Sequence, residues 1–384
     1  MSNLETEQRL FVVTAPGLEA ITAREMRALG LAGRRVGQPT VGGLEFAGSL
    51  RDLYRLNLHL RTASRVIVRL GEFYAAAFSE LRKKASYLPW ERYLRPGQPV
   101  AVRATCHQSK LYHSDAVAER VLGAIGDRMG APAELAAWDE DSPETPPQGV
   151  VVRLSNNMAT VSMDSSGALL HRRGYRLATA KAPLRETLAA AMLLASEWDM
   201  EAPLLDPFCG SGTIPIEAAL LARQIAPGKI RRFAFMDWTS FAADLWAEEH
   251  AAALAAEREV MPLLLASDRD AGAIRAAEAN AGRAGVSGAI TFTCQAVSAV
   301  TPPLGPGWVV TNPPYGVRVS ADKDLRNLYA QLGNVLRMHC PRWQVALLCN
   351  GLPLLQQARL QLEPPQSWVN GGLRVLFARG VVRD

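Results

Sequence analysis

The feature that most constrains this chain is an octet at residues 206–213, Asp-Pro-Phe-Cys-Gly-Ser-Gly-Thr. Residues 202–205 before it form a short apolar run typical of a buried strand, and residues 214–224 after it favour a helix. Gly210 and Gly212 lack a Cβ, so the backbone can turn sharply and approach a ligand closely, while the start of a helix offers unpaired N–H groups. The octet therefore predicts a ligand-binding turn between a strand and a helix of an α/β fold.

The residue types of the octet narrow the choice of ligand. A phosphate-binding loop is similar in outline, but the Lys-Ser or Lys-Thr ending that holds phosphates is absent, and the leading acid would repel them. An acid at the end of a strand suits a cofactor that carries a positively charged amino group, as S-adenosylmethionine does. The alternative without a ligand is an ordinary strand–helix turn made of small residues.

The octet strongly resembles motif I of class I methyltransferases. This resemblance implies a Rossmann-like domain that binds S-adenosyl-L-methionine. The cofactor ligands that it implies within the octet are Asp206, Phe208, Gly210, Gly212 and Thr213.

Composition places the chain among globular proteins of two or three domains, with 384 residues, 48% of them hydrophobic and 21% charged. There is no apolar run of about 18 residues and no basic-then-apolar start, so we expect a cytoplasmic protein without membrane spans. The five cysteines form no Cys-x-x-Cys pair, which argues against disulfides and a zinc site. A net charge of +5 permits a nucleic-acid partner without demanding one.

The N-terminal half alternates short apolar strands with helices. A strand at 99–105 leads into the polar connection 106–113, followed by a helix that Ser114 could cap. This arrangement resembles the THUMP domain of RNA-modifying enzymes, and residues 1–60 resemble the ferredoxin-like unit that precedes it. The resemblance implies three domains, at residues 1–60, 61–165 and 166–384, and an RNA-binding role for Lys110. A solvated loop is the competing interpretation of the residues around Lys110.

A basic stretch beginning at His171 would connect the two halves, and a helix is expected from Pro183 to about Trp198. It resembles the segment before motif I in THUMP-bearing methyltransferases, where it covers one side of the cofactor. Arg172, Arg173 and Arg176 could meet RNA phosphates, or they could form a solvated charge run.

Two further positions follow strands of the C-terminal half. Asp268 ends a second apolar strand and is the expected ribose ligand, whereas Asp270 is better explained as a helix cap. After the third strand, Ala296 stands where methyltransferases of this type commonly place an Asp for the adenine amino group. This departure leaves backbone N–H groups and apolar packing to hold the adenine. The aromatic residues between 226 and 261 are expected to pack locally.

The fourth strand, Trp308 to Thr311, leads into Asn312-Pro313-Pro314-Tyr315. The oxygens of the Asn312 side chain and the Pro313 backbone can accept the two hydrogens of an exocyclic amine. This localises the amine lone pair and stabilises the positive charge that develops during methyl transfer. Two prolines stiffen the loop, and Tyr315 offers a ring on which a flipped base can stack. The scheme requires no metal.

These features together resemble a THUMP-containing RNA guanine-N2 methyltransferase of the family that modifies 23S ribosomal RNA. The resemblance implies an RNA substrate, ribosomal or possibly transfer RNA, selected by the N-terminal half. Relatives of this type are often labelled adenine-N6 DNA methylases, because the tetrapeptide also serves that chemistry. A DNA adenine methyltransferase, a protein glutamine methyltransferase and a non-catalytic RNA-binding protein remain alternatives.

Overall fold

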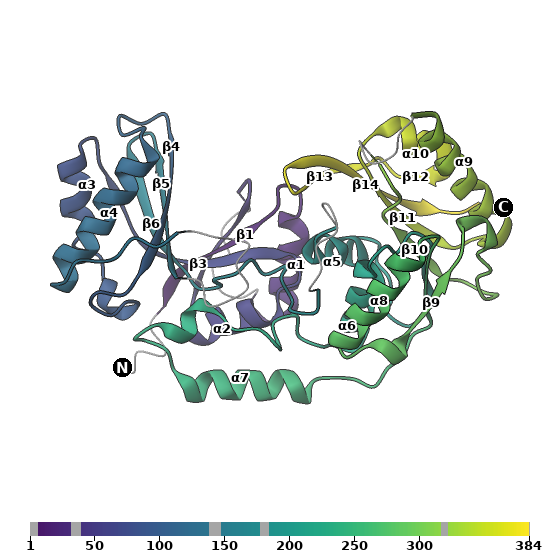
Figure 1. Cartoon of the computed structure of the whole chain (residues 1–384), viewed down its shortest axis with the longest axis horizontal. Helices are drawn as coiled ribbons and strands as arrows, with labels where there is room; N and C mark the ends of the chain where they lie inside the picture. The colour runs from purple at the N-terminus through teal and green to yellow at the C-terminus, as the bar shows by residue number, and fades with distance from the viewer. Residues whose placement is uncertain (1–6, 32–39, 138–146, 177–183, 316–321, 384) are drawn as a thin grey trace. The chain divides into compact units, whose positions relative to one another are not determined.

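A computed structural model describes residues 7–31, 40–137, 147–176, 184–315 and 322–383. Those residues form two compact units, each assembled from separate parts of the chain (Figure 1). Unit 1 comprises residues 1–14, 25–170 and 230–252, and unit 2 comprises residues 15–24, 171–229 and 253–384. Both units are therefore discontinuous in sequence, whereas the three ranges expected from the sequence are continuous.

Unit 1 is built on a six-stranded sheet with the strand order β2-β1-β3-β6-β5-β4. Among the described strands antiparallel pairing dominates, and β4 pairs parallel with β5. The strands are β1 Gln8–Thr14, β2 Gly43–Gly48, β3 Ala63–Tyr74, β4 Val100–His107, β5 Gln148–Ser155 and β6 Met158–Asp164. The helices of this part are α1 Glu19–Ala28, α2 Leu50–His59, α3 Phe78–Ala85, η1 Trp90–Arg92 and α4 Ser114–Met129, with α1 divided between the two units.

The start of α4 differs from the prediction. His113 is the N-cap and no side chain caps the helix, so Ser114 is the first helical residue and not the cap. The acidic, proline-rich stretch at 138–149 has no hydrophobic periodicity and predicts an exposed loop, but residues 138–146 lie outside the described residues.

An aromatic segment from the C-terminal half of the sequence completes the core of unit 1. It contains η2 Ala234–Asp237 and most of α7 Ala243–Ala255. The Phe235 ring stacks on Tyr54 of α2 at 4.5 Å, and the Trp238 indole donates a hydrogen bond of 2.8 Å to the Gln148 side chain. The expected local packing is confirmed, because Phe233 and Phe235 stack at 5.3 Å and Trp246 contacts both rings. The segment also contacts side chains that are far away in the sequence, which the sequence did not indicate.

Unit 2 contains a sheet in the order β12-β14-β11-β10-β7-β8-β9, with β13 paired to β14. The five strands from β11 to β9 are parallel, and β14 runs antiparallel to β11. The strands are β7 Leu204–Asp206, β8 Leu264–Asp268, β9 Ile290–Cys294, β10 Trp308–Thr311, β11 Gln344–Cys349, β12 Gln361–Leu362, β13 Gln366–Asn370 and β14 Leu373–Val381. The helices are α5 Glu186–Ala195, α6 Thr213–Ala222, α8 Ala271–Arg283, η3 Ser287–Ala289, η4 Val297–Ala299, α9 Asp322–His339 and α10 Leu352–Ala358.

Helices cover both faces of this sheet, because successive strand residues point into different cores (Figure 1). Leu204 and Val310 pack with α5, α6 and α8, whereas Leu205 and Val309 pack with α9 and α10. This is the Rossmann-like α/β architecture expected from the sequence. The carboxyl ends of the parallel strands therefore lie along one edge, where both sequence motifs emerge.

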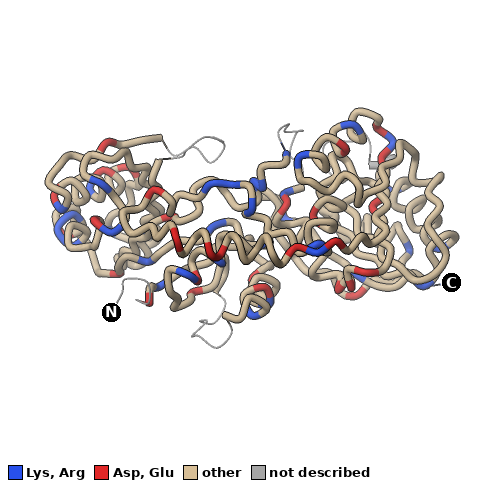
Figure 2. Tube along the Cα trace, turned by 90° about the horizontal axis from the view of Figure 1, so that it is seen from below, with Lys and Arg blue, Asp and Glu red and all other residues tan. Residues whose placement is uncertain are grey.

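Basic and acidic residues are interspersed along the trace of both units (Figure 2). None of the described helices has the length and apolar character needed to cross a membrane.

Candidate active site

The octet forms the turn between β7 and α6. Gly210 and Gly212 have φ values of +51° and +83°, in the left-handed region that favours glycine. A Cβ on Gly212 would also lie 3.0 Å from the Cβ of Ala277 in α8. The turn needs glycine at this position for both reasons, and it directs the first N–H groups of α6 toward the carboxyl edge of the sheet.

Asp206 is a buried acid, only 1% exposed, at the end of β7. Its Oδ1 atom accepts hydrogen bonds from the Thr311 hydroxyl at 2.6 Å and from the Phe208 N–H at 3.2 Å. Burial raises the pKa of this carboxyl to about 7; the two hydrogen bonds oppose the rise, and the charge of Asp268 adds to it. Because Thr311 directly precedes Asn312, Asp206 joins the glycine turn to the Asn-Pro-Pro-Tyr loop.

Asp268 lies at the end of β8, the strand next to β7. Its two side-chain oxygens accept hydrogen bonds from the Gly210 N–H and from the Asp270 N–H, each at 3.0 Å. The carboxylate therefore lies beside the glycine turn and retains lone pairs for further donors. The Asp270 side chain accepts from the Gly272 N–H at 2.7 Å, which confirms it as the cap of α8.

The remaining residues expected to bind the cofactor lie at the same edge. Phe208 is partly buried against the core on the α9 side, and Thr213 is the first residue of α6. Ala296 is an exposed residue that precedes η4, two residues after the end of β9.

The Asn-Pro-Pro-Tyr loop leaves the sheet at the end of β10, which lies between β7 and β11. The Oδ1 atom of Asn312 is buried and has no hydrogen-bond partner among the described residues. Such an acceptor is costly to bury unless a donor reaches it, so its presence indicates a site for a ligand N–H. The Tyr315 ring packs against both cores of unit 2, and its hydroxyl lies 3.5 Å from the Nδ2 atom of Asn370 in β13.

The basic stretch after Leu170 requires a correction. Arg173 is 3% exposed, and its Nε atom lies 3.5 Å from the buried Glu217 of α6. The Tyr175 hydroxyl donates to the same Glu217 oxygen at 3.1 Å, and Arg176 donates to the buried Glu186 at 2.8 Å. The expectation that Arg173 and Arg176 contact RNA phosphates is not met in this structure, because both guanidinium groups are held against buried carboxylates.

The two other candidate RNA ligands have different surroundings. Arg172 is half-buried. Lys110 is exposed in unit 1, on the connection between β4 and α4, and its backbone N–H donates to the Asn157 side chain at 2.7 Å. The Asn157 N–H donates a hydrogen bond of 3.0 Å to the Ser109 hydroxyl, so the connection is fixed against the β5–β6 turn. Pro183, the expected start of α5, lies outside the described residues, and α5 spans Glu186–Ala195.

Sequence reasoning missed Thr311, Glu217 and Asn370 as parts of this site. Nothing in the sequence pairs Thr311 with Asp206, because the two residues are brought together only when β7 and β10 become neighbours. For Asn370 a signal existed, since Asn-Gly-Gly between two apolar segments is typical of a two-residue hairpin turn.

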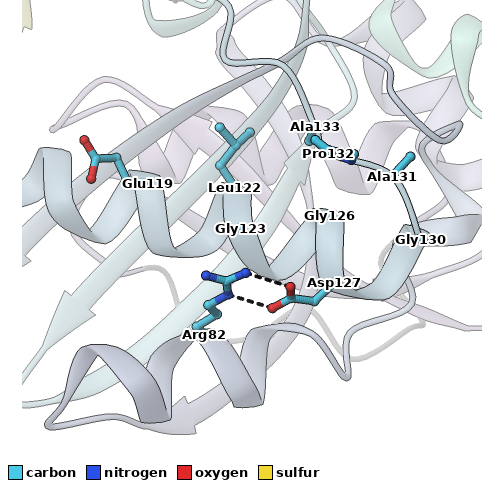
Figure 3. Close-up of a pocket in the computed structure, with 10 residues that line it drawn as sticks. All are labelled: Arg82, Glu119, Leu122, Gly123, Gly126, Asp127, Gly130, Ala131, Pro132 and Ala133. Atoms are coloured by element: carbon cyan, nitrogen blue, oxygen red, sulfur yellow. Dashed lines mark hydrogen bonds and ion pairs between the residues drawn. The ribbon is translucent and has the colours of Figure 1, made fainter.

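A groove of about 450 Å³ lies in unit 1, between α3, α4 and the chain that follows α4 (Figure 3). Arg82 of α3 and Asp127 of α4 form a bidentate ion pair across it, with distances of 2.6 and 2.7 Å. The Arg82 guanidinium packs on Gly123, where a Cβ would lie 3.1 Å from it. The small side chains of α4 thus accommodate a structural ion pair, and none of the described residues that line the groove has a buried polar side-chain atom without a partner.

Comparison with known proteins shows three matching family models. The model described as RMKL-like methyltransferase domain matches residues 173–366, the RlmL ferredoxin-like domain matches residues 9–67, and the THUMP domain matches residues 75–164.

Similar proteins match over nearly the whole chain. "Ribosomal RNA large subunit methyltransferase K/L" of Syntrophotalea carbinolica is 38% identical over 379 residues, which is 94% of this chain and 52% of the relative. "Putative RNA methyltransferase slr0064" of Synechocystis is 34% identical over 371 residues, covering 96% of this chain and 95% of the relative. The crystal structure of SMU.472 complexed with SAH has a TM-score of 0.87 at 28% identity, covering 98% of this chain and 99% of that one. The chain spans about half the length of the K/L relative that it matches.

Proposed function

Since this chain belongs to the family of RMKL-like methyltransferases that carry a THUMP domain, we propose that it transfers a methyl group from S-adenosylmethionine to the N2 amine of a guanine in ribosomal RNA. The observation that carries the proposal is the buried Oδ1 atom of Asn312, which has no hydrogen-bond partner among the residues that the structure describes. It lies on the loop that Thr311 and Asp206 connect to the glycine turn.

The site fits S-adenosylmethionine by the chemistry of its residues. Asp206 offers a buried carboxyl for a cationic amino group, Asp268 offers acceptors for ribose hydroxyls, and the turn at Gly210 and Gly212 leaves room for close approach. When bound, the cofactor supplies an electrophilic methyl group on a sulfonium. In SMU.472, a structure with the same fold throughout, SAH is bound.

Asn312 supplies the acceptor that activates the amine. The lone pair of a guanine N2 amine is delocalised into the base. Hydrogen bonds from the amine to Asn312 Oδ1 and the Pro313 carbonyl localise this lone pair on the nitrogen. The same two oxygens would then stabilise the positive charge that grows on the amine as the new N–C bond forms and the methyl–sulfur bond breaks, and the methylated nitrogen becomes neutral again by releasing one proton to solvent. Tyr315, held by two cores and by Asn370, provides a ring for stacking the base.

We assign recognition of the RNA to unit 1. The Asn-Pro-Pro-Tyr loop is too small to recognise a structured RNA, and the THUMP match lies within unit 1. Lys110 is exposed on a connection that hydrogen bonds hold in place, which suits a contact to a phosphate.

The test compares Asn312→Ala with the wild type. We expect the variant to bind S-adenosylmethionine with unchanged affinity in calorimetry and to lose methyl transfer by about 100-fold or more, the effect of removing one transition-state hydrogen bond. Asn334→Ala, which removes an exposed asparagine of α9, is the matched control and should keep full activity. A loss below about threefold in Asn312→Ala would show that the assigned role is wrong.

Mass spectrometry of ribosomal RNA nucleosides then identifies the product. RNA from a strain that lacks the gene should be deficient in N2-methylguanosine at one position, and the purified protein should restore it. If the protein instead restores N6-methyladenosine, the target base is adenine and not guanine, and the role assigned to Asn312 is unchanged.

A further inference from the structure

The β13–β14 hairpin projects beyond the edge of the sheet where the reaction loop lies. β14 pairs antiparallel with β11 until Leu376, which is opposite Cys349, the last residue of β11. Leu373 therefore lies three residues beyond the end of that strand. The neighbouring strand β10 runs parallel to β11 and releases Asn312 at the same edge.

A direct contact places the tip of this hairpin beside the reaction loop. Asn370, the last residue of β13, lies opposite Leu373, the first residue of β14. The Nδ2 atom of Asn370 is 3.5 Å from the hydroxyl of Tyr315. Asn370 therefore links the exposed end of the hairpin to the Tyr315 ring, on which the target base is proposed to stack.

The hairpin is rigid at its base and tightly closed at its tip. Trp368 and Phe377 are both buried and stack at 4.3 Å, which anchors the two strands in the core of unit 2. Gly371 and Gly372, with φ values of +56° and +88°, form a two-residue turn. Because both ends are fixed, the tip holds its side chains in a defined position.

Leu373 is the large apolar side chain at this tip, and it is 64% exposed. A single exposed leucine is ordinary on a protein surface. Leu373, however, is held beside the Asn-Pro-Pro-Tyr loop, whose proposed reaction requires that the target base leave the base stack of the RNA. The next residue, Arg374, is also exposed. An apolar side chain inserted between two base steps keeps the step open. The Nε atom of Arg374 donates to the Ser367 hydroxyl at 2.8 Å, and the guanidinium has further N–H groups that can contact a flanking phosphate.

We infer that the tip of the β13–β14 hairpin is a wedge in which Leu373 enters the base stack of a paired RNA segment and holds the target base in the extruded position. Leu373 is then a positioning residue, because it acts on the neighbouring bases and not on the amine. The inference rests on the proposed function, methylation of a base amine in RNA.

The experiment uses the full chain and two RNAs that carry the methylated nucleotide identified by mass spectrometry. In one RNA the target base is paired within a stem, and in the other the same strand lacks its complement. Values of kcat/KM are measured for the wild type, Leu373→Ala, Leu373→Met and Leu304→Ala. Leu304 is a fully exposed leucine on another loop and serves as the matched control.

We expect Leu373→Ala to lose about tenfold or more in kcat/KM on the paired RNA and less than about twofold on the unpaired RNA, because only the paired base has a stack to leave. Leu373→Met should retain the wild-type ratio between the two RNAs, since it keeps a long apolar side chain, and Leu304→Ala should match the wild type on both.

Equal losses of Leu373→Ala on both RNAs, or no loss on the paired RNA, would overturn the wedge while leaving the proposed function intact. A wild-type protein that methylates neither RNA would instead refute the proposed function, and the wedge with it. Unfolding temperatures identical to the wild type are expected for every variant, because each changes an exposed side chain.

Discussion

Replacement of Asp206 by asparagine measures the energetic cost of the acid that lies under the glycine turn. Burial raises the pKa of this carboxyl from 3.8 to about 7 in the folded state. Between these pH values the folded protein binds a proton that the unfolded chain has released, so the stability falls as the pH rises and the loss is complete above pH 7. The shift corresponds to about 4 kcal/mol at about 1.36 kcal/mol per pH unit.

Asparagine should remove this cost while keeping the local structure. Its side-chain oxygen can accept the hydrogen bonds from Thr311 and Phe208, and it carries no charge to bury. Without cofactor, Asp206→Asn should therefore be more stable than the wild type at pH 8, by up to about 4 kcal/mol, and the gain should be roughly 2 to 3 kcal/mol smaller at pH 5. Because about 1 kcal/mol shifts the melting temperature by about 2–4 °C in a unit of this size, a gain of up to about 4 kcal/mol at pH 8 corresponds to a rise of up to roughly 8–16 °C.

The assay is thermal unfolding of both proteins at pH 5 and pH 8, with calorimetry of S-adenosylmethionine binding on the same samples. The same variant should bind the cofactor more weakly, because the neutral amide no longer attracts a cationic amino group. Asp270→Asn is the control, since this cap is exposed and its amide oxygen can still accept from Gly272. If Asp206→Asn melts no higher than the wild type at pH 8, or its gain is the same at both pH values, the buried acid does not destabilise the free enzyme as argued.

Three further variants test neighbouring features. Thr311→Val removes the hydroxyl that donates to Asp206 and should lower the stability by about 1–3 kcal/mol in urea unfolding at pH 8; unchanged stability would mean that the hydrogen bond contributes nothing. Gly212 and Gly285 both have a left-handed backbone, but an added Cβ would contact Ala277 only at Gly212 and would meet open space at Gly285. Gly212→Ala should therefore destabilise the protein more than Gly285→Ala, and equal melting temperatures of the two variants would contradict this. Lys110→Gln should weaken binding to ribosomal RNA and make it less dependent on salt without changing the melting temperature, whereas an unaltered salt slope would remove Lys110 from the interface.

The strands of unit 2 were predictable because buried parallel strands appear in the sequence as short apolar runs. The apolar runs at 308–311 and 344–349 each predict a strand, and the bounds of β10, Trp308–Thr311, and β11, Gln344–Cys349, agree with them at both ends. In the β13–β14 hairpin the apolar residues of 373–378 predict a last strand, which is part of β14, whereas β13, Gln366–Asn370, was not predicted because it mixes polar residues with the buried Trp368. Helix starts were less predictable, since capping at Ser114 depends on backbone geometry that a residue type does not determine.

The site was predictable where the residue type itself carries the chemistry. An acid at the end of β7, two glycines after it and an amide after β10 suggest functional roles without any knowledge of their neighbours, and these roles stay predictions. The environment of Arg173 and Arg176 was not predictable, because a run of arginines has the same appearance in the sequence whether it faces water or buried carboxylates such as Glu217 and Glu186.

Because each unit is built from separate segments of the sequence, the order of synthesis limits when each unit can complete its fold. Tyr54 of α2 leaves the ribosome early, but its stacking partner Phe235 follows about 180 residues later. At about 5–20 residues per second, the growing chain waits roughly 10–40 seconds for that partner. A nascent chain that ends shortly after Leu170 therefore contains every strand of the first sheet but lacks the aromatic segment that completes its core. Unit 1 matures only after translation has already produced β7 and the glycine turn of the cofactor domain, so neither unit can be finished before synthesis of the other has begun.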